Sequence, residues 1–240
     1  MLATFQALEQ FSSTVTPDLE RSTPPMPRYL VVLGGSLAAV FMWSGIHPRD
    51  VGTWWLEVMP VIIGVPILVA TYRRFPLTPL AYVLIWIHAI ILMVGGHYTY
   101  AEMPLFNWIR DAFALSRNHY DRVGHFAQGF VPAILAREVL LRTSPLRAGK
   151  WLFFLVCCVS LAISAFYELF EWWAALVTSP ETGTAFLGTQ GDVWDTQWDM
   201  ALALVGAICS QLFLGRLHDS QLTRRAEPPV QSDRASPELP

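Results

Sequence analysis

The stretch that decides the fold is Arg117-Asn118-His119-Tyr120-Asp121-Arg122-Val123-Gly124-His125-Phe126-Ala127-Gln128-Gly129. It places two histidines, an aspartate and two arginines at the start of an apolar run that ends near Leu141. A charged side chain at mid-depth in a membrane helix costs about 2.5–3.5 kcal/mol on the insertion scale. Asp121 and His125 are four residues apart, so they share one face of a helix. We therefore expect a polar site at the start of a membrane-spanning helix.

The composition of the chain is that of a membrane protein. Of its 240 residues, 53% are hydrophobic and only 15% are charged, and the mean hydropathy is +0.39. These values indicate one polytopic domain with short polar ends. The net charge of -3 and the lack of a Lys/Arg cluster exclude a nucleic-acid-binding footprint. Three cysteines lie in apolar runs and are predicted to act as small apolar side chains outside any disulfide framework.

Apolar segments recur along the chain at the length that crosses a bilayer, which is about 20 residues. The sequence predicts an all-α fold, a polytopic transmembrane helical bundle of about six spans. The bundle is expected to cover residues 29–217, after a cytoplasmic tail (1–28) and before a disordered cytoplasmic tail (218–240). The six predicted spans are 29–46, 53–72, 77–97, 118–141, 151–177 and 196–217.

Arginine and lysine residues set the expected orientation. They precede the first span, join the second to the third and the fourth to the fifth, and follow the sixth. The connection between the fifth and sixth spans has none. The positive-inside rule then places both termini in the cytoplasm. The connection between the third and fourth spans, with Arg110, Arg117 and Arg122, argues the other way.

Two connections have features of their own. The connection between the fifth and sixth spans contains Gly183, Gly188 and Gly191 and is predicted to be a mobile loop. The connection between the third and fourth spans contains apolar residues at helical spacing, which predicts an amphipathic helix in the membrane interface. This helix either covers a site or simply covers the bundle. Its apolar side consists of Leu105, Trp108, Ile109, Ala112 and Phe113.

Acidic and imidazole side chains gather at the predicted outer ends of five spans. Chance would scatter such costly groups, so their common depth favours a shared polar cavity. Simpler roles remain open, since Asn118 with Asp121, and Thr196 with Asp199, also match helix-capping patterns. The residues at this depth are Glu57, His97, Asp121, His125, Glu168, Glu171, Asp192, Asp195 and Asp199.

Imidazoles and carboxylates together suit a divalent metal such as zinc or manganese. Such a metal activates water beside a carboxylate or imidazole that acts as a base. The chain contains no His-Glu-x-x-His motif and no Gly-x-Ser-x-Gly motif. The candidate bases are Glu171 and His119. The candidate metal ligands are Asp121, His125, Glu168, and Asp195 or Asp199.

The cytoplasmic half of the bundle is expected to carry few polar groups. Arg137 is predicted to extend to the cytoplasmic interface, with Glu138 beside it. His218 is predicted to be interfacial or solvated, and His88 to be a histidine of the apolar core. Apart from His88, the sequence therefore predicts no second polar layer.

Three motifs carry a resemblance to a known family. They are residues 118–129, 167–172 and 191–200, and together with the spans they resemble the YjdF-type bacterial inner-membrane proteins over about residues 30–217. The resemblance implies a multi-pass protein of the bacterial inner membrane and supplies no substrate, because that family is a domain of unknown function. A more distant resemblance joins the chain to the VanZ-like membrane proteins, which are associated with glycopeptide resistance. The residues that match their pattern are Asp121, His125, Phe126, Glu168 or Glu171, and Asp195 or Asp199.

Three functions fit these observations. The first is an enzyme that carries out metal-assisted hydrolysis or transfer on a lipid or envelope precursor, and it requires a lateral opening beside Asp121 and His125. The second is a carrier for a cation or small solute, which requires a second polar layer in the cytoplasmic half. The third is a structural or regulatory membrane protein, in which Arg117 and Arg122 pair with the acids and leave no cavity.

Overall fold

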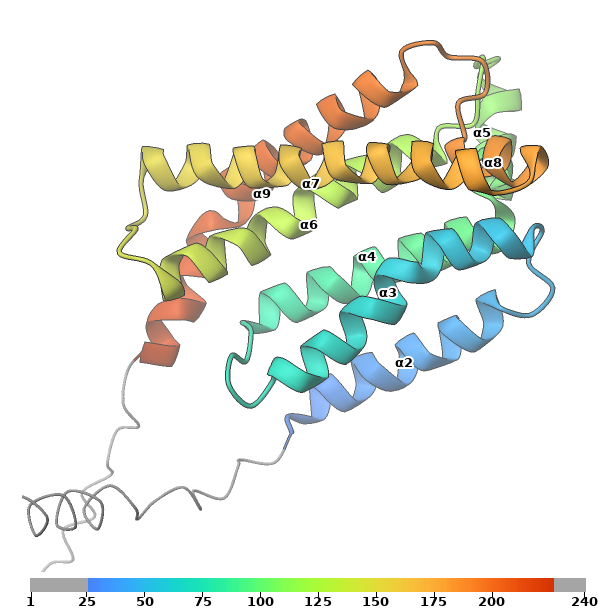
Figure 1. Ribbon diagram of the computed structural model, residues 1–240. Coiled ribbons are helices and arrows are strands. Elements are labelled where there is room, and N and C mark those ends of the chain that lie inside the picture. Colours follow the sequence, from blue (N-terminus) through green and yellow to red (C-terminus); the bar gives the residue numbers. More distant parts are fainter. Residues whose placement is uncertain (1–25, 227–240) are drawn as a thin grey trace, which may run out of the picture.

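Long helices form the part of the chain that the structure describes, residues 26–226 of a computed structural model. No strand occurs within this range, so the predicted all-α fold is confirmed. Figure 1 shows the arrangement of the elements in a single bundle. In chain order they are α2 (Arg28–Ser44), α3 (Val51–Thr71), α4 (Pro79–Tyr98), the short 3-10 helix η1 (Tyr100–Glu102), α5 (Pro104–Ala112), α6 (Tyr120–Thr143), α7 (Lys150–Val177), α8 (Pro180–Leu187) and α9 (Asp195–Ala226).

Four helices, α3, α4, α7 and α9, are long and apolar enough to cross a membrane. The other two predicted spans correspond to α2, which has 17 residues, and α6, which has 24 residues and carries charged side chains. Helix α6 packs against α4, α7 and α9. Because these neighbours cover it, α6 can hold polar residues that would be costly against lipid. The bundle is that of an integral membrane protein.

Both ends of the described chain lie at one end of the bundle, which we call the terminal end (Figure 1). Helices α5 and α8 lie at the opposite end, which we call the site end. Helix α9 continues to Ala226, so residues 218–226, predicted as part of a disordered tail, are helical. The remainder of the two predicted tails, 1–25 and 227–240, lies outside the described residues.

Helices α6 and α9 cross in direct backbone contact. A Cβ atom at Gly129 of α6 would lie 1.7 Å from the carbonyl oxygen of Ala203 on α9. A Cβ atom at Gly206 of α9 would lie 2.2 Å from the carbonyl oxygen of Phe126 on α6. Small residues allow membrane helices to approach backbone to backbone, where van der Waals packing holds them together. The two glycines therefore set the distance between the helices that carry most of the polar residues.

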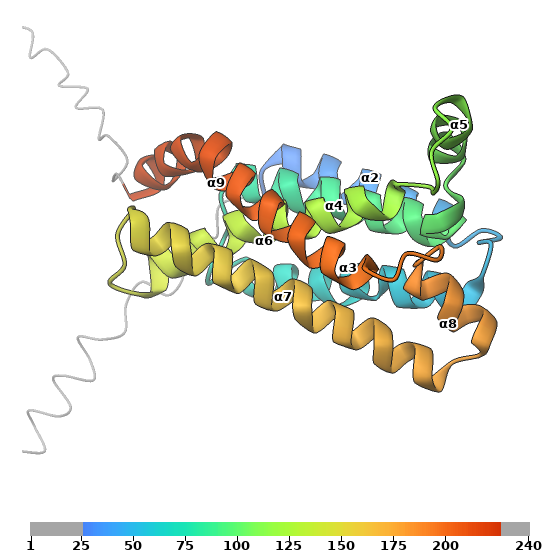
Figure 2. The same cartoon turned by 90° about the horizontal axis from the view of Figure 1, so that it is seen from above.

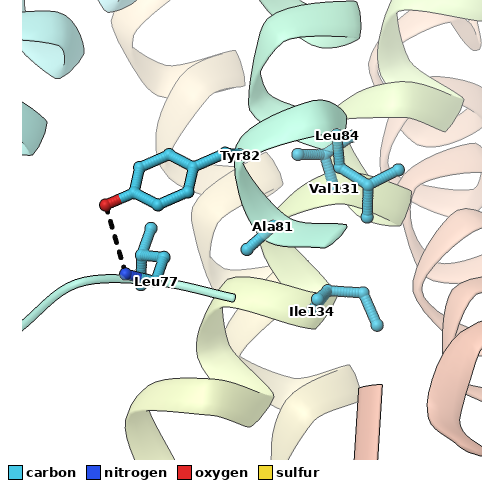
Figure 3. Close-up of a cluster of buried hydrophobic side chains, with 6 residues drawn as sticks. All are labelled: Leu77, Ala81, Tyr82, Leu84, Val131 and Ile134. Carbon is cyan, nitrogen blue, oxygen red and sulfur yellow. Dashed lines mark hydrogen bonds between the residues drawn. The ribbon is translucent and has the colours of Figure 1, made fainter. Parts of the chain in front are cut away.

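Apolar packing joins the start of α4 to α6 near the terminal end. Figure 3 shows the side chains of this cluster between the two helices. The backbone N–H of Leu77 donates to the hydroxyl of Tyr82 at 3.2 Å, which satisfies a polar group among apolar neighbours. The buried members of the cluster are Leu77, Ala81, Tyr82, Leu84, Val131 and Ile134.

A buried charged cluster also lies at the terminal end, formed by Arg137, Glu138 and His218. The carboxylate of Glu138 accepts from the N–H of Thr78 at 3.0 Å, from His218 Nε2 at 3.1 Å and from Arg142 at 2.7 Å. Arg137 lies 2.9 Å from His218 Nδ1, and because a guanidinium only donates, Nδ1 accepts and Nε2 holds the proton. This terminal-end cluster ties α4, α6 and α9 together.

The terminal-end cluster corrects one prediction. His218 is not solvated, since it is 0% exposed. The reason is that α9 continues beyond residue 217 beside α6, so that His218 contacts Arg137 and Glu138 of α6. Arg137 is also buried but reaches the partly exposed Asp219 at 2.7 Å, and its extension to the interface stays a prediction. The prediction that the half of the bundle near the termini lacks a polar layer apart from His88 is also wrong.

The connection between α7 and α9 contains a helix, so the prediction of a mobile loop is wrong. Helix α8 begins after Ser179, whose hydroxyl accepts from the N–H of Thr182 at 3.2 Å. Pro180 occupies the first helical turn, where a missing N–H is tolerated. The helix ends at Gly188, which has a left-handed φ of 59°.

The amphipathic pattern between the third and fourth predicted spans forms a helix, α5, as expected. Figure 2 shows α5 projecting away from the bundle at the site end. Its apolar residues Leu105 and Trp108 are exposed, and so is Phe113 at its C-terminal end. Exposed apolar side chains on one face of a short helix suit the membrane interface, as the sequence predicts.

We expect Gly129→Ala to destabilise the protein, because the new methyl group would push the α9 backbone away from α6. Overpacking of this kind costs roughly 1–3 kcal/mol. The measurement is the apparent melting temperature of detergent-purified protein. The matched control is Gly215→Ala on α9, where a Cβ atom meets nothing within 4 Å. Equal melting temperatures for both variants would contradict a rigid crossing.

Candidate functional site

Helices α6 and α9 bring three predicted metal ligands together at the site end. Suitable donor atoms of Asp121, His125 and Asp199 all lie within 4.8 Å of one another, and all three residues are buried. His125 Nε2 lies 3.3 Å from Asp121 Oδ1 and 3.8 Å from Asp199 Oδ2. We call these residues the acid–imidazole cluster. Asp121 and His125 lie together because they are four residues apart on α6, and the crossing of α6 and α9 brings Asp199 beside them.

The opposite edge of the His125 ring contacts two further polar groups. Nδ1 lies 2.9 Å from Gln128 Oε1 and 3.6 Å from Glu168 Oε1. When Nδ1–H donates to the Gln128 carbonyl, Nε2 presents a lone pair toward two carboxylates. Such a group of acceptors needs a cation between them, either a proton or a metal ion. Metal-bound histidines are oriented in this way by a partner on the second ring nitrogen.

Two carboxylates at the site end each have one oxygen atom without a hydrogen bond within the described residues. Asp199 is 2% exposed, and its Oδ1 atom has no hydrogen bond within the described residues. The same is true of Glu168 Oε1. An ionised carboxylate buried without a partner is strongly unfavourable. The acid–imidazole cluster is therefore short of positive charge.

Two arginines neutralise the remaining acids above the acid–imidazole cluster, in what we call the arginine layer. Arg117 is 5% exposed and donates to Asp195 and, at 3.2 Å, to Asp121. Arg122 donates to Asp192 at 2.8 Å. The N–H of Trp194, together with Arg122, holds the pKa of Asp192 below its usual range. Both arginines are thus committed to partners on the segment that leads into α9.

A cavity of about 210 Å³ lies beside the acid–imidazole cluster. Helices α3, α4, α6 and α7 and the short helix η1 all contribute to its walls. Ile163 of α7 lines the cavity and is also 41% exposed on the flank of the bundle. The cavity wall therefore includes a residue that is also part of the outer surface of the bundle. Its polar lining consists of Glu57, His88, Tyr100, Asp121, His125, Gln128, Tyr167 and Glu171.

Tyr100 is held in the cavity wall by two glycines. Cβ atoms at Gly95 of α4 and Gly124 of α6 would lie 2.2 Å and 2.7 Å from its ring, so the ring fits only between glycines. The preceding residue, Thr99, has a φ of 60°. A positive φ is strained for a β-branched residue, and such strain is common at functional sites. The strained turn directs Tyr100 into the bundle.

The structure separates the predicted site residues into groups. Asp121, His125 and Asp199 form the acid–imidazole cluster, and Asp199 lies inside α9 rather than capping it. Glu168 contacts the far edge of the His125 ring, and Glu171 lines the cavity. Asp195 instead pairs with Arg117 in the arginine layer.

His119 precedes α6 and is not among the residues that line the cavity. Burial and the nearby Arg117 lower its pKa. Sequence reasoning missed Tyr100 and Gln128. The glycines at positions 95 and 124 are the only sequence signal that pointed to Tyr100, since they leave room for its ring.

Comparison with known proteins agrees with this architecture. A family model described as "Predicted membrane protein (DUF2238)" matches residues 29–220. The chain belongs to this family. It is 56% identical over 189 residues to the inner membrane protein YjdF of Escherichia coli (strain K12), which covers 79% of this chain and 90% of that protein. No solved structure matches the chain.

Membership of this family confirms the YjdF-type resemblance seen in the three motifs. It also confirms that the chain is an inner-membrane protein, in agreement with its apolar helices. The resemblance to VanZ-like proteins and the orientation of the termini stay predictions. The family description carries no activity, so any chemistry must be argued from the site itself.

We expect Arg117→Gln to destabilise the fold strongly, because Asp121 and Asp195 would be left buried without their cation. Removing one partner of a buried ion pair costs about 3–5 kcal/mol. The control is Arg110→Gln, since Arg110 pairs with the exposed Asp111 and exposed ion pairs contribute little to stability. Apparent melting temperatures of both variants in detergent provide the measurement. A similar small effect in both would show that the arginine layer does not hold the site end together.

Proposed function

We propose that the protein is a metal-dependent membrane enzyme that carries out hydrolysis or transfer on a lipid or envelope precursor. The observation that carries this proposal is the acid–imidazole cluster, in which Asp199 Oδ1 has no hydrogen bond within the described residues, beside a cavity whose wall includes the surface-exposed Ile163. With the termini in the cytoplasm, as the distribution of arginines favours, the substrate enters from the outer leaflet.

The donor set fits a divalent metal such as zinc or manganese. Bond lengths of 2.0–2.2 Å place the donors around a tetrahedral metal roughly 3.4 Å apart. The distances from His125 Nε2 to Asp121 and Asp199 are 3.3 Å and 3.8 Å. Two carboxylates and one imidazole leave a position free for water, as in catalytic zinc sites. We assign these three residues as the ligands and Asp195 to the arginine layer.

The surrounding residues suit supporting roles. Gln128 and Glu168 contact Nδ1 of His125 and would hold the ring so that Nε2 faces the metal. A bound metal would supply Lewis-acid activation of water. Glu171 lines the same cavity and is the carboxylate that we assign as the base receiving a proton from that water. His119 lies outside the cavity lining and has no role in this scheme.

The two alternative functions are less well supported. A carrier needs a polar layer near the other side of the membrane, and the terminal-end cluster lies there. However, the Glu138 carboxylate already accepts hydrogen bonds from Thr78, Arg142 and His218, so the layer suits a fixed structural tie. A purely structural protein would pair its acids with arginine and leave no cavity. The arginine layer fits that expectation, whereas the cavity and the Asp199 carboxylate, which pairs with no arginine within the described residues, do not.

The metal proposal is tested by elemental analysis of protein purified in detergent without chelator. We expect about one divalent metal ion per chain, either retained or regained after adding zinc or manganese. Asp199→Asn and His125→Ala should both reduce bound metal to background. Asp111→Asn, which changes an exposed aspartate of α5, is the control and should retain metal. A parent protein that stays metal-free after zinc and manganese are added would overturn the proposal.

Turnover is tested with metal-loaded protein in an extract of inner-membrane lipids, followed by mass spectrometry. We expect one lipid class to be converted by the parent protein and spared by Glu171→Gln. Loss of a positioned base lowers a rate by about 10²–10⁴-fold. Metal content is measured in the same samples, because Glu171→Gln should still bind metal. A parent protein that binds metal and leaves every lipid class unchanged would overturn lipid turnover.

A further inference from the structure

The cavity beside the acid–imidazole cluster is lined by carboxylates and by no basic side chain other than histidine. Glu57 enters from α3, Asp121 from α6 and Glu171 from α7, and neither Lys nor Arg is among the residues that line it. The metal ligands assigned above include only Asp121 of these three. Glu171 is the assigned base, so Glu57 faces the cavity with no role in the proposed metal site.

Glu171 and Glu57 are poorly satisfied by the protein. Glu171 is 6% exposed and makes no hydrogen bond and no ion pair within the described residues, although it faces the cavity. Glu57 is 4% exposed, and within the described residues its carboxylate accepts a single hydrogen bond, a long one of 3.5 Å from the hydroxyl of Tyr167. Buried carboxylates without cationic partners favour a positively charged ligand beside them.

Two tyrosines complete the wall around Glu57. Tyr100 is fixed between Gly95 and Gly124, and Tyr167 comes from α7 beside His125, with ring centroids 6.4 Å apart. Aromatic faces attract ammonium groups, and the attraction is stronger in sites shielded from water. Carboxylates and tyrosine rings around one cavity therefore favour a cationic group over an anionic one.

Apart from the proposed metal, an anionic group finds no equivalent partner in the lining of this cavity. Arg117 and Arg122, the nearest guanidinium groups of the site, donate to Asp121, Asp195 and Asp192 in the arginine layer. A phosphate in the cavity would meet Glu57 and Glu171 instead, and like charges in a buried site repel strongly.

We propose that the cavity binds an ammonium group of the substrate, with Glu57 as its anchor between Tyr100 and Tyr167. This inference rests on the proposed function, since it names the chemical class of the molecule that the metal site would act on. The ammonium group belongs either to a lipid headgroup or to a small soluble amine. Both share the same recognition chemistry, so the experiment separates the two sources.

The first experiment measures binding of ethanolamine to the full-length protein in nanodiscs, by isothermal titration calorimetry. Ethylene glycol is a neutral molecule of similar size and should bind at least tenfold more weakly. Nanodiscs made of phosphatidylglycerol and nanodiscs containing phosphatidylethanolamine are compared. If the natural ligand is a lipid amine, phosphatidylethanolamine should weaken ethanolamine binding by competition. If it is a soluble amine, the two nanodiscs should give the same affinity.

The second experiment measures Glu57→Gln, with metal content determined on the same samples. We expect this variant to bind ethanolamine at least tenfold more weakly while it retains its metal. Glu181→Gln, which changes an exposed carboxylate of α8, is the control and should leave ethanolamine binding unchanged.

The outcomes separate the two proposals. Equal binding of ethanolamine and ethylene glycol by the parent protein overturns the ammonium site, whether or not metal is present. Unchanged ethanolamine affinity in a folded Glu57→Gln overturns Glu57 as the anchor. Absence of metal from the parent protein overturns the proposed function, and in that case ethanolamine binding that depends on Glu57 would show an acidic amine site that acts without metal.

Discussion

The site depends on how closely two parallel-running helices can approach. Gly129 and Gly206 remove the side chains that would hold α6 and α9 apart. Only at this separation do Asp121 and His125 on one helix come within reach of Asp199 on the other. The same two helices form the terminal-end cluster, where Glu138 meets His218. One backbone contact near the middle thus positions polar groups at both ends of the bundle.

Charge is distributed unevenly along this pair of helices. At the terminal end, the acid Glu138 accepts hydrogen bonds from several donors and is fully satisfied. In the arginine layer, each guanidinium has a carboxylate partner. In contrast, the acid–imidazole cluster and the cavity contain more acidic than basic side chains. Proteins retain such imbalance mainly where a ligand or proton restores it, and this distinguishes the cavity from the other polar regions.

The sequence predicted the class of fold and the layer in which the site lies, because apolar run length and helical spacing are local properties. It also contained the signals for α8, since Ser179 and Pro180 mark a helix start and Gly188 a helix end, although they were interpreted as a loop. Whether Asp195 or Asp199 is the metal ligand could not be predicted from local sequence, because it depends on which turn of α9 faces His125. The burial of His218 likewise depends on the length of α9 beside α6.

The polar character of α6 has a consequence for how the protein is made. Its length is sufficient to cross the membrane, yet it is not among the helices that are apolar enough to do so unaided. Helix α4 precedes it in the chain, whereas α7 and α9, which cover its other faces, are synthesised later. Helix α6 must therefore wait for its partners at the translocon or be stabilised by them after release, as polar helices generally are. The residues that give the site its chemistry also make its assembly cooperative and late.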